Sequence, residues 1–207
     1  MFYYLTFGLA LGLAAGFSPG PLLTLVLSET LKHGLSSGIK VALAPIITDA
    51  PIVLITFLIA TQLSDVNNIL GIISLIGGCY VLYMAYESTQ QENQKSNPIN
   101  TKPKSLLKGV ITNALSPHPY LFWLSVGAPT VAQSMNVNAI APILFIGGFY
   151  LLLIGSKVFL AVLVGKSKTF LSGPAYIYTM KFLAFTLVIF AIILFVDGLT
   201  LLGIVKT

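Results

Sequence analysis

Charged side chains are scarce in this sequence, and their scarcity sets the class of protein. Only 8% of the 207 residues are charged, 56% are hydrophobic, and the mean hydropathy is +0.93. A water-soluble domain carries roughly 25% charged residues, which form the polar shell around its core. The composition therefore excludes an ordinary soluble domain and predicts an all-α integral membrane protein whose main partner is the lipid bilayer.

Arginine is absent, and cysteine is nearly so. All eleven basic residues are lysines, and Cys79 is the single cysteine. We expect no nucleic-acid partner, because nucleic-acid sites usually combine a basic stripe with arginine and aromatic side chains. One cysteine without companion ligands forms neither an internal disulfide nor a thiolate metal site.

The sequence also lacks the signatures of an enzyme. It holds no glycine-rich phosphate loop, no metal-ligand cluster and no nucleophile with a base at a recognisable spacing. We therefore expect no enzymatic activity, no cofactor and no bound metal. Without a nucleotide site, a transporter is predicted to be a secondary carrier driven by an ion gradient, unless a separate ATPase serves it.

Long apolar stretches, in contrast, fill most of the chain. A membrane-spanning helix needs about 20 mostly apolar residues. Candidate spans lie at 2–30, 38–62, 67–86, 106–132, 139–164 and 177–203. The hydrophilic stretch 87–105 is predicted to be a linker, which divides the chain into a first three-helix repeat (1–86) and a second one (106–207).

The first and fourth spans each contain a Ser-Pro-x-Pro motif, at residues 18–21 and 116–119. Proline lacks an N–H and clashes with the preceding turn, so helices 1 and 4 are predicted to be broken there. Pro45 and Pro142, in the spans that follow, share nearly the same offset as the motifs, which favours a duplication. An odd number of spans per copy makes the two repeats inverted, and paired breaks of this kind indicate a transporter's binding site.

Lysines gather on one side of the predicted topology. The first, third and fifth connections, with their flanks, hold Lys32, Lys40, Lys95, Lys102, Lys104, Lys108, Lys166 and Lys168. Lys157 and Lys181 lie near the fifth connection, and we expect both to snorkel to that surface. The opposite side has Asp65, Asp197 and Lys206. The positive-inside rule then places the linker in the cytoplasm and both termini outside.

One carboxylate lies deep in the predicted membrane region. Asp49 stands near the middle of the second span, after Thr48, between Pro45 and Pro51. A charge at this depth costs roughly 2.5–3.5 kcal/mol and usually faces a cavity or a partner. Asp49 is predicted to bind the amine of a substrate, to carry a coupling proton, or to do both in turn. The alternative is a carboxyl group that only joins helices.

His118 occupies the variable position of the second motif, where the first motif has Gly20. Histidine changes its charge near neutral pH, so His118 is a candidate proton relay. The alternative is a neutral ring that hydrogen-bonds the carbonyl groups freed beside Pro117 and Pro119.

Other polar side chains accompany both breaks. Ser18, Ser116 and Asn113 are expected to satisfy backbone groups that the prolines release, or to offer polar contacts to a ligand. A half-helix that begins after a break presents an amide end suited to a substrate carboxylate. Tyr120 and Trp123 lie close enough to the second break to line the same cavity.

Two features of the first span concern packing rather than chemistry. Gly8, Gly12 and Gly16 repeat every four residues, a spacing that lets helices approach closely. This stripe is predicted to serve internal packing or dimerisation, so a homodimer stays possible. Glu29 lies near the end of the span and is expected at the membrane interface.

The run Gly16-Phe17-Ser18-Pro19-Gly20-Pro21, the glycine-containing connection 34–38 and Asp49 together resemble the LysE/RhtB amino-acid exporter family. The stretch 108–117 is similar to the family's glycine, asparagine and proline pattern at the start of its fourth helix. The resemblance implies an inner-membrane exporter of amino acids or similar metabolites, powered by proton exchange.

The resemblance also implies roles for single residues. It places residues 18–21 in the first break, Asp49 in the ion or substrate site, and Asn113 with Pro117 in the second break. Ser116 and His118 depart from the family's pattern around the second proline.

Two alternatives to an amino-acid exporter follow from the same residues. An exporter of metal cations or other ions would need several inward-facing ligands, and only Asp49 and His118 are candidates. A membrane redox protein would need a cysteine in each break, where Gly20 and His118 stand instead. The predicted site has Asp49 and His118 as substrate or proton-coupling residues and a lining of Ser18, Pro19, Gly20, Pro21, Thr48, Asn113, Ser116, Pro117 and Pro119.

Overall fold

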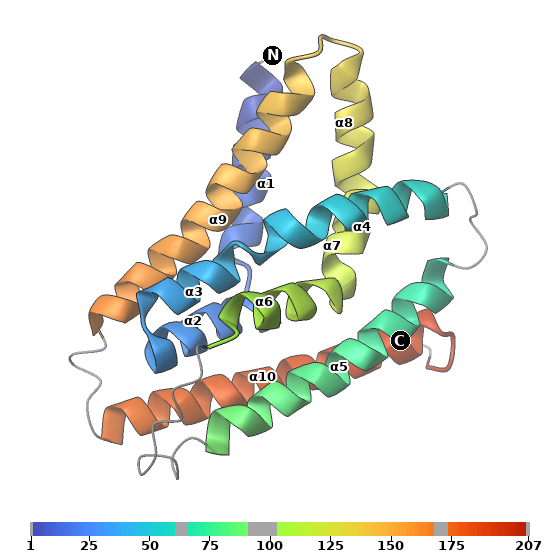
Figure 1. Cartoon of the computed structure of the whole chain (residues 1–207). Coiled ribbons are helices and arrows are strands. Elements are labelled where there is room, and N and C mark those ends of the chain that lie inside the picture. The colour runs from blue at the N-terminus through green and yellow to red at the C-terminus, as the bar shows by residue number, and fades with distance from the viewer. Residues whose placement is uncertain (1, 61–65, 91–102, 168–173, 206–207) are drawn as a thin grey trace.

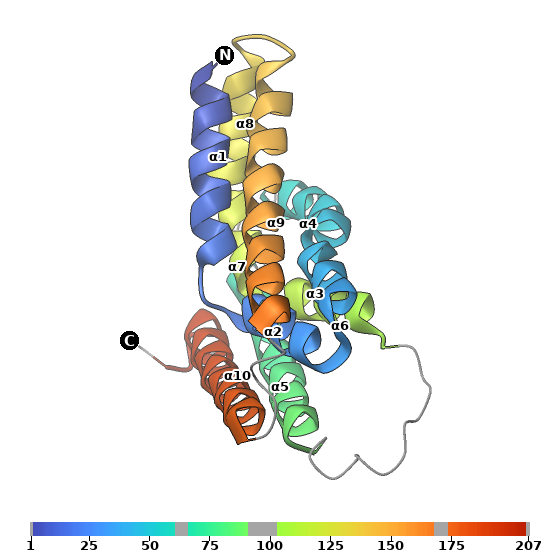
Figure 2. The same cartoon turned by 90° about the vertical axis from the view of Figure 1, so that its left-hand side faces the viewer.

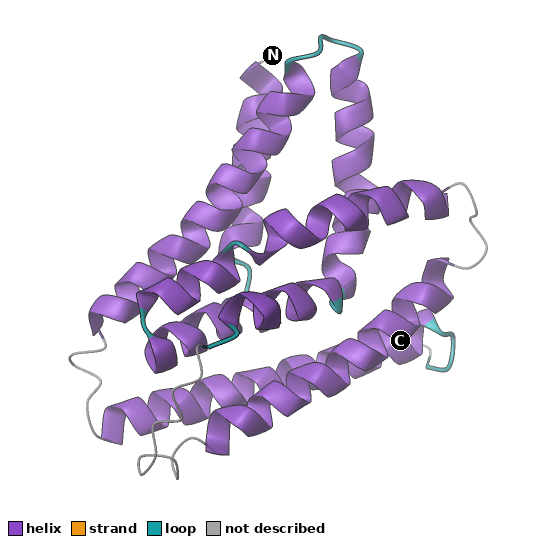
Figure 3. Cartoon of the chain, viewed as in Figure 1, coloured by secondary structure: helices purple, strands orange, loops and turns teal. Residues whose placement is uncertain are grey.

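The protein is helical throughout the part of the chain that the structure describes. The computed structural model describes residues 2–60, 66–90, 103–167 and 174–205, in which helices and turns occur without strands (Figure 3). The helical elements are α1 (Phe2–Phe17), α2 (Pro21–His33), α3 (Leu35–Ala42), α4 (Ala44–Ala60), α5 (Val66–Gln90), α6 (Ser105–Ala114), α7 (Pro117–Phe122), the π-helical segment η2 (Trp123–Gly127), α8 (Ala128–Met135), α9 (Ala141–Ser167) and α10 (Pro174–Leu201). The all-α prediction is confirmed for these residues.

Among the residues that the structure describes, four stretches are long and apolar enough to cross a membrane: Leu35–Val53, Asn67–Tyr86, Ala141–Lys166 and Ile177–Leu201. The pair α1 and α2, bent by 63° at the break, makes a fifth candidate. The protein is therefore a multi-pass membrane protein. The predicted span 106–132 is divided among α6, α7, η2 and α8, so the arrangement of six spans in two inverted repeats stays a prediction.

The predicted linker 87–105 falls largely outside the described residues. Helix α5 continues to Gln90, and α6 begins at Ser105. Residues 91–102 of the linker lie outside the part of the chain that the structure describes.

Two long helix pairs frame the molecule. Helix α1 lies along α9, and α5 lies along α10, and the two pairs cross steeply (Figures 1 and 2). Each pair joins a helix from residues 1–86 with one from residues 106–207, so the two predicted halves are packed together rather than separated. A core of buried apolar side chains from α2, α3, α5, α9 and α10 fills the space between the pairs.

Glycines allow α1 to approach α9 closely. Gly8, Gly12 and Gly16 are the buried residues of α1. A Cβ atom at Gly8 would overlap the carbonyl oxygen of Phe145, and one at Gly12 would overlap that of Phe149. The glycine stripe therefore serves packing within the chain, which is one of its two predicted roles.

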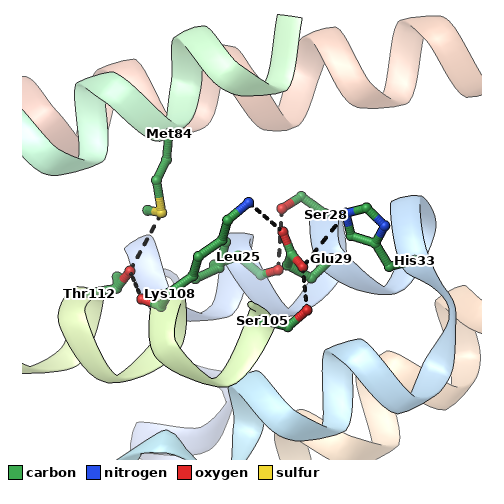
Figure 4. A network of polar contacts seen from close by, with 8 residues as sticks. All are labelled: Leu25, Ser28, Glu29, His33, Met84, Ser105, Lys108 and Thr112. Carbon is green, nitrogen blue, oxygen red and sulfur yellow. Dashed lines mark hydrogen bonds and ion pairs between the residues drawn. The ribbon is translucent and has the colours of Figure 1, made fainter. Parts of the chain in front are cut away.

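A buried polar cluster joins α2 to α6 near the end of α2 (Figure 4). Ser105 donates a hydrogen bond of 2.5 Å to Glu29 Oε2, and Lys108 Nζ lies 3.2 Å from Glu29 Oε1. His33 Nε2 lies 4.0 Å from Glu29 Oε2. Glu29 is only 1% exposed, so its carboxylate is buried inside the protein, while its place at the membrane interface stays a prediction. The carboxylate tolerates burial because a hydroxyl and an ammonium group from α6 compensate it.

Substitution of Gly12 by alanine is expected to destabilise the protein by about 1–3 kcal/mol, because the methyl group meets a backbone carbonyl that cannot move alone. Gly147→Ala on α9 is the matched control, since a Cβ there would have no neighbour within 4 Å. The free energy of unfolding in mixed detergent micelles measures the difference. Equal stabilities of the two variants would contradict the close approach of α1 and α9.

Removal of the Lys108 charge is expected to cost about 3–5 kcal/mol, because Lys108→Gln leaves the buried Glu29 carboxylate without its nearer ion-pair partner. The double variant Glu29→Gln with Lys108→Gln is expected to recover most of this loss, because the uncompensated charge is then gone as well. The same unfolding measurement, arranged as a double-mutant cycle, gives the coupling energy. Additive effects of the two substitutions would refute the buried pair.

Candidate functional site

The first break separates α1 from α2 and leaves carbonyl groups of α1 without helical partners. Helix α1 ends at Phe17, and α2 begins at Pro21 with an extended Gly20 before it. The carbonyl of Ala15 would accept from residue 19 in a continuous helix, but Pro19 has no N–H. A different donor must therefore reach the end of α1.

Lys157 provides this donor from α9. Its Nζ donates to the carbonyl oxygens of Ala15 and Gly16, each at 3.1 Å, and the side chain is buried. A cation suits this position because the carbonyl end of a helix carries a partial negative charge. The prediction that Lys157 snorkels to a surface is wrong, because its ammonium group is held inside by these two carbonyl oxygens.

The second break separates α6 from α7 at Leu115 and Ser116. The hydroxyl of Tyr120 donates to the carbonyl of Ala114, the last residue of α6, at 2.9 Å. Ser116 makes no side-chain bond to the following helix, and no side-chain hydrogen bond of Ser18 occurs within the described residues. The prediction that these serines satisfy the freed backbone is wrong, because the longer side chains of Lys157 and Tyr120 reach the helix ends instead.

Asp49 is the meeting point of four elements. The residue is 4% exposed and lies on α4. Its Oδ2 accepts hydrogen bonds from the hydroxyl of Tyr150 on α9 at 2.9 Å and from the indole N–H of Trp123 in η2 at 3.3 Å. Its Oδ1 accepts from the side-chain amide of Asn113 on α6 at 3.2 Å.

Thr48 completes this network. Asn113 Nδ2 also lies 2.6 Å from Thr48 Oγ1, which itself is 3.4 Å from Asp49 Oδ1. The side chain of Asn113 thus joins α6 to α4, in place of the predicted bond to freed backbone groups. The hydrogen-bond donors around the Asp49 carboxylate are therefore all neutral: two hydroxyl groups, an indole N–H and a side-chain amide.

A cavity of about 430 Å³ lies between the two breaks and Asp49. The predicted residues that line it are Ser18, Pro19, Gly20, Pro21, Asp49, Asn113, Ser116, His118 and Pro119. Its remaining walls are largely apolar and include Phe122, Trp123, Phe149, Leu153, Phe190, Ile193 and Leu194. Two motifs far apart in the sequence therefore share one cavity with a carboxylate.

Two predicted lining residues lie behind the cavity wall rather than on it. Thr48 and Pro117 are buried and do not line the cavity. Tyr120 also lies off the wall, and its hydroxyl is bound to the end of α6. His118 lines the cavity but forms no hydrogen bond with another described residue, so the alternative of a ring bound to freed carbonyls is not observed.

Sequence reasoning missed Lys157 and Tyr150. Lys157 stands seven residues before the end of the predicted span 139–164, about 10 Å of helix rise from that end. A lysine so far from the end of a span does not easily reach the membrane surface, so the position of Lys157 in the sequence already indicates a buried ammonium group. Tyr150 has no comparable signal, because one tyrosine in an apolar helix does not reveal its partner.

The cavity does not resemble a metal site within the described residues. No group of three or more histidine, cysteine, aspartate or glutamate side chains there could hold a metal ion. Asp49 and His118 are the members of these residue types on its wall.

Comparison with known proteins places the chain in a family. Residues 13–198 match the family model of the LysE type translocators. A relative in Escherichia coli (strain K12), the uncharacterized membrane protein YahN, is 30% identical over 135 residues. The alignment covers 62% of this chain and 60% of that relative, which is less than two thirds of the relative's length. No solved structure matches the chain. Since the family model spans most of the sequence, the protein belongs to the LysE type translocator family.

Proposed function

We propose that the protein is a secondary active exporter of amino acids or related small metabolites in the cytoplasmic membrane, working by proton antiport. One observation carries the proposal: both broken helices and a buried carboxylate line a single cavity. Discontinuous helices build substrate sites in many secondary transporters because they present backbone groups at membrane depth. Intramembrane carboxylates commonly serve proton and ion pathways.

The reciprocal packing of the helices supports six spans in two inverted repeats. Helix α1, before the first break, packs on α9, whereas α6, before the second break, packs on α3 and α4. Likewise α2 contacts α3, and α8 contacts α9. Each of these contacts thus has a counterpart between the corresponding helices of the other half, as expected if a pseudo-two-fold axis relates the two repeats. The lysine distribution favours a cytoplasmic linker and outer termini.

The size and walls of the cavity suit a small ligand with an apolar part. A volume of about 430 Å³ lies in the lower part of the usual range for small-molecule sites, roughly 300–1,000 Å³. Phe122, Phe149 and Phe190 would face an apolar side chain, whereas Asp49 offers a carboxylate to an ammonium group. An amino acid with an apolar side chain combines these two features.

Asp49 gives a direct mechanism for exchange. The carboxylate can hold either a proton or the ammonium group of a substrate, but it cannot pair with an ammonium group once it is protonated. Tyr150, Trp123 and Asn113 hold the carboxylate in place through neutral hydrogen bonds. Outward release of the substrate would then be followed by protonation of Asp49, and inward release of that proton would prepare the site for the next substrate.

The export of metal cations is the second candidate, and the lining of the cavity supports it less well. A cation site would need several oxygen, nitrogen or sulfur ligands. Asp49 and His118 supply two such side chains, while the remaining wall is largely apolar. A panel of divalent metals beside the amino acids therefore belongs in the transport assay.

Asp49→Asn is expected to abolish amino-acid transport driven by a pH gradient in proteoliposomes, with a loss of at least about 100-fold. The amide preserves the size of the side chain but neither takes up the coupling proton nor attracts an ammonium group. Asp197→Asn on α10 is the matched control, since Asp197 does not line the cavity, and it should transport like the parent. Transport by Asp49→Asn at parental rates across pH would disprove the coupling role, and transport of metals alone would favour the second candidate.

His118→Gly gives the second break the residue of the first, and it is expected to retain transport but to lose part of its pH dependence near neutrality. Histidine is the side chain that ordinarily changes charge there. The pH profile of initial transport rates measures the effect. Ser116→Ala, a change in the same break without a titratable group, should keep the parental profile. An unchanged profile in His118→Gly would leave His118 only a lining role.

A further inference from the structure

Lys157 brings a positive charge to the wall of the cavity. It lies on α9, is 4% exposed and lines the cavity together with Asp49. Its two hydrogen bonds go to neutral carbonyl oxygens, those of Ala15 and Gly16. An ammonium group has three donors, so one donor of Lys157 has no partner among the described residues.

The two opposite charges of the cavity do not neutralise each other. Asp49 is held by neutral donors, Lys157 is held by neutral acceptors, and no ion pair joins them in the part of the chain that the structure describes. A buried charge without a counter-charge is costly, and a ligand of opposite charge lowers that cost. The cavity therefore presents one negative and one positive group to its contents.

The first turn of α2 adds to the positive end. Leu22 and Leu23 line the cavity at the start of α2, directly after the break. The first amides of a helix have no partner within the helix and carry a partial positive charge. Lys157 binds the carbonyl end of α1 on the other side of the same break. Thus, the Lys157 ammonium group and the amide end of α2 both lie next to the first break.

We propose that Lys157 is a specificity-determining residue that binds the carboxylate of the substrate at the first break, while Asp49 binds its ammonium group. This inference rests on the proposed function and deepens it: the carried compound must have both a carboxylate and an ammonium group. The two bonds to α1 hold the Lys157 side chain in position, and its third donor is the one offered to the substrate. An amine without a carboxylate would leave this donor unmatched.

Binding to the purified full-length protein tests the assignment with three probes that share one apolar side chain. Leucine carries both charges, leucinamide lacks the carboxylate, and 4-methylpentanoate lacks the ammonium group. The rise in melting temperature with ligand concentration gives each dissociation constant. The unsubstituted protein is expected to bind leucine more tightly than either of the other two.

Lys157→Gln is expected to weaken the binding of leucine and of 4-methylpentanoate at least tenfold and to leave leucinamide within about twofold. Lys157→Arg, which keeps the charge, should retain leucine binding. Lys166→Gln, also on α9 but outside the cavity, is the matched control and should bind all three probes like the parent. A cooperative melting transition of each variant without ligand verifies that it has folded.

Three results would overturn the inference: equal leucine affinity with and without the Lys157 charge, a parallel loss of leucine and leucinamide binding, or no binding of any probe to the unsubstituted protein. The proposed function fails in a different way. Leucine binding would then depend on Lys157 as expected, but no amino acid would cross proteoliposome membranes under a pH gradient.

Discussion

Backbone carbonyl groups that lose their helical partners at the two proline-containing breaks are the constraint on which the rest of this structure depends. Water is not available at membrane depth, so a freed carbonyl must find a donor within the protein. At the first break this donor is Lys157, and at the second it is Tyr120. The first solution requires α9 to lie against the end of α1. The glycines of α1 permit that approach, since larger residues would collide with the backbone of α9.

Helix α9 connects this constraint to the carboxylate. Tyr150 and Lys157 are two turns apart on α9 and therefore share one face. Tyr150 donates to Asp49, and Lys157 donates to the end of α1. Helix α6 has a comparable position, because its Ser105 binds Glu29 at one end and its Asn113 binds Asp49 at the other. The hydrogen bonds of two buried carboxylates thus fix how the broken helices sit against their neighbours.

Much of this arrangement could be predicted from the sequence, because its main features are local. A Ser-Pro-x-Pro motif breaks a helix whatever surrounds it, and Asp49 in an apolar span must face a cavity or a partner. The breaks and the presence of Asp49 on a shared cavity follow from these two facts. The donors at the breaks could not be predicted in the same way. Ser18 and Ser116 were the nearest polar residues in sequence, but packing between distant helices brings Lys157 to one of these ends.

Glu29 illustrates the same limit. Its place near a span end predicts a position at the membrane interface but does not reveal its burial, which depends on Lys108, a residue that follows a long hydrophilic stretch of sequence. A charge can be buried only where its partner is supplied, and the pairing of α2 with α6 is a property of the fold rather than of either segment. Position along a single helix is therefore a sound guide to breaks but a poor one to the burial of charge.

At the two breaks, different chemical groups bind the carbonyl end of the preceding helix, and this difference makes the two ends of the cavity unequal. A neutral phenol binds the end of α6, whereas an ammonium group binds the end of α1. The motifs also differ at their variable position, with Gly20 in the first and His118 in the second, and both residues line the cavity. A strictly symmetric pair of repeats would offer a ligand two equivalent ends. Here the Lys157 charge belongs to the first break alone, so the proposed roles of Lys157 and Asp49 would give a ligand with separated charges one preferred orientation in the cavity.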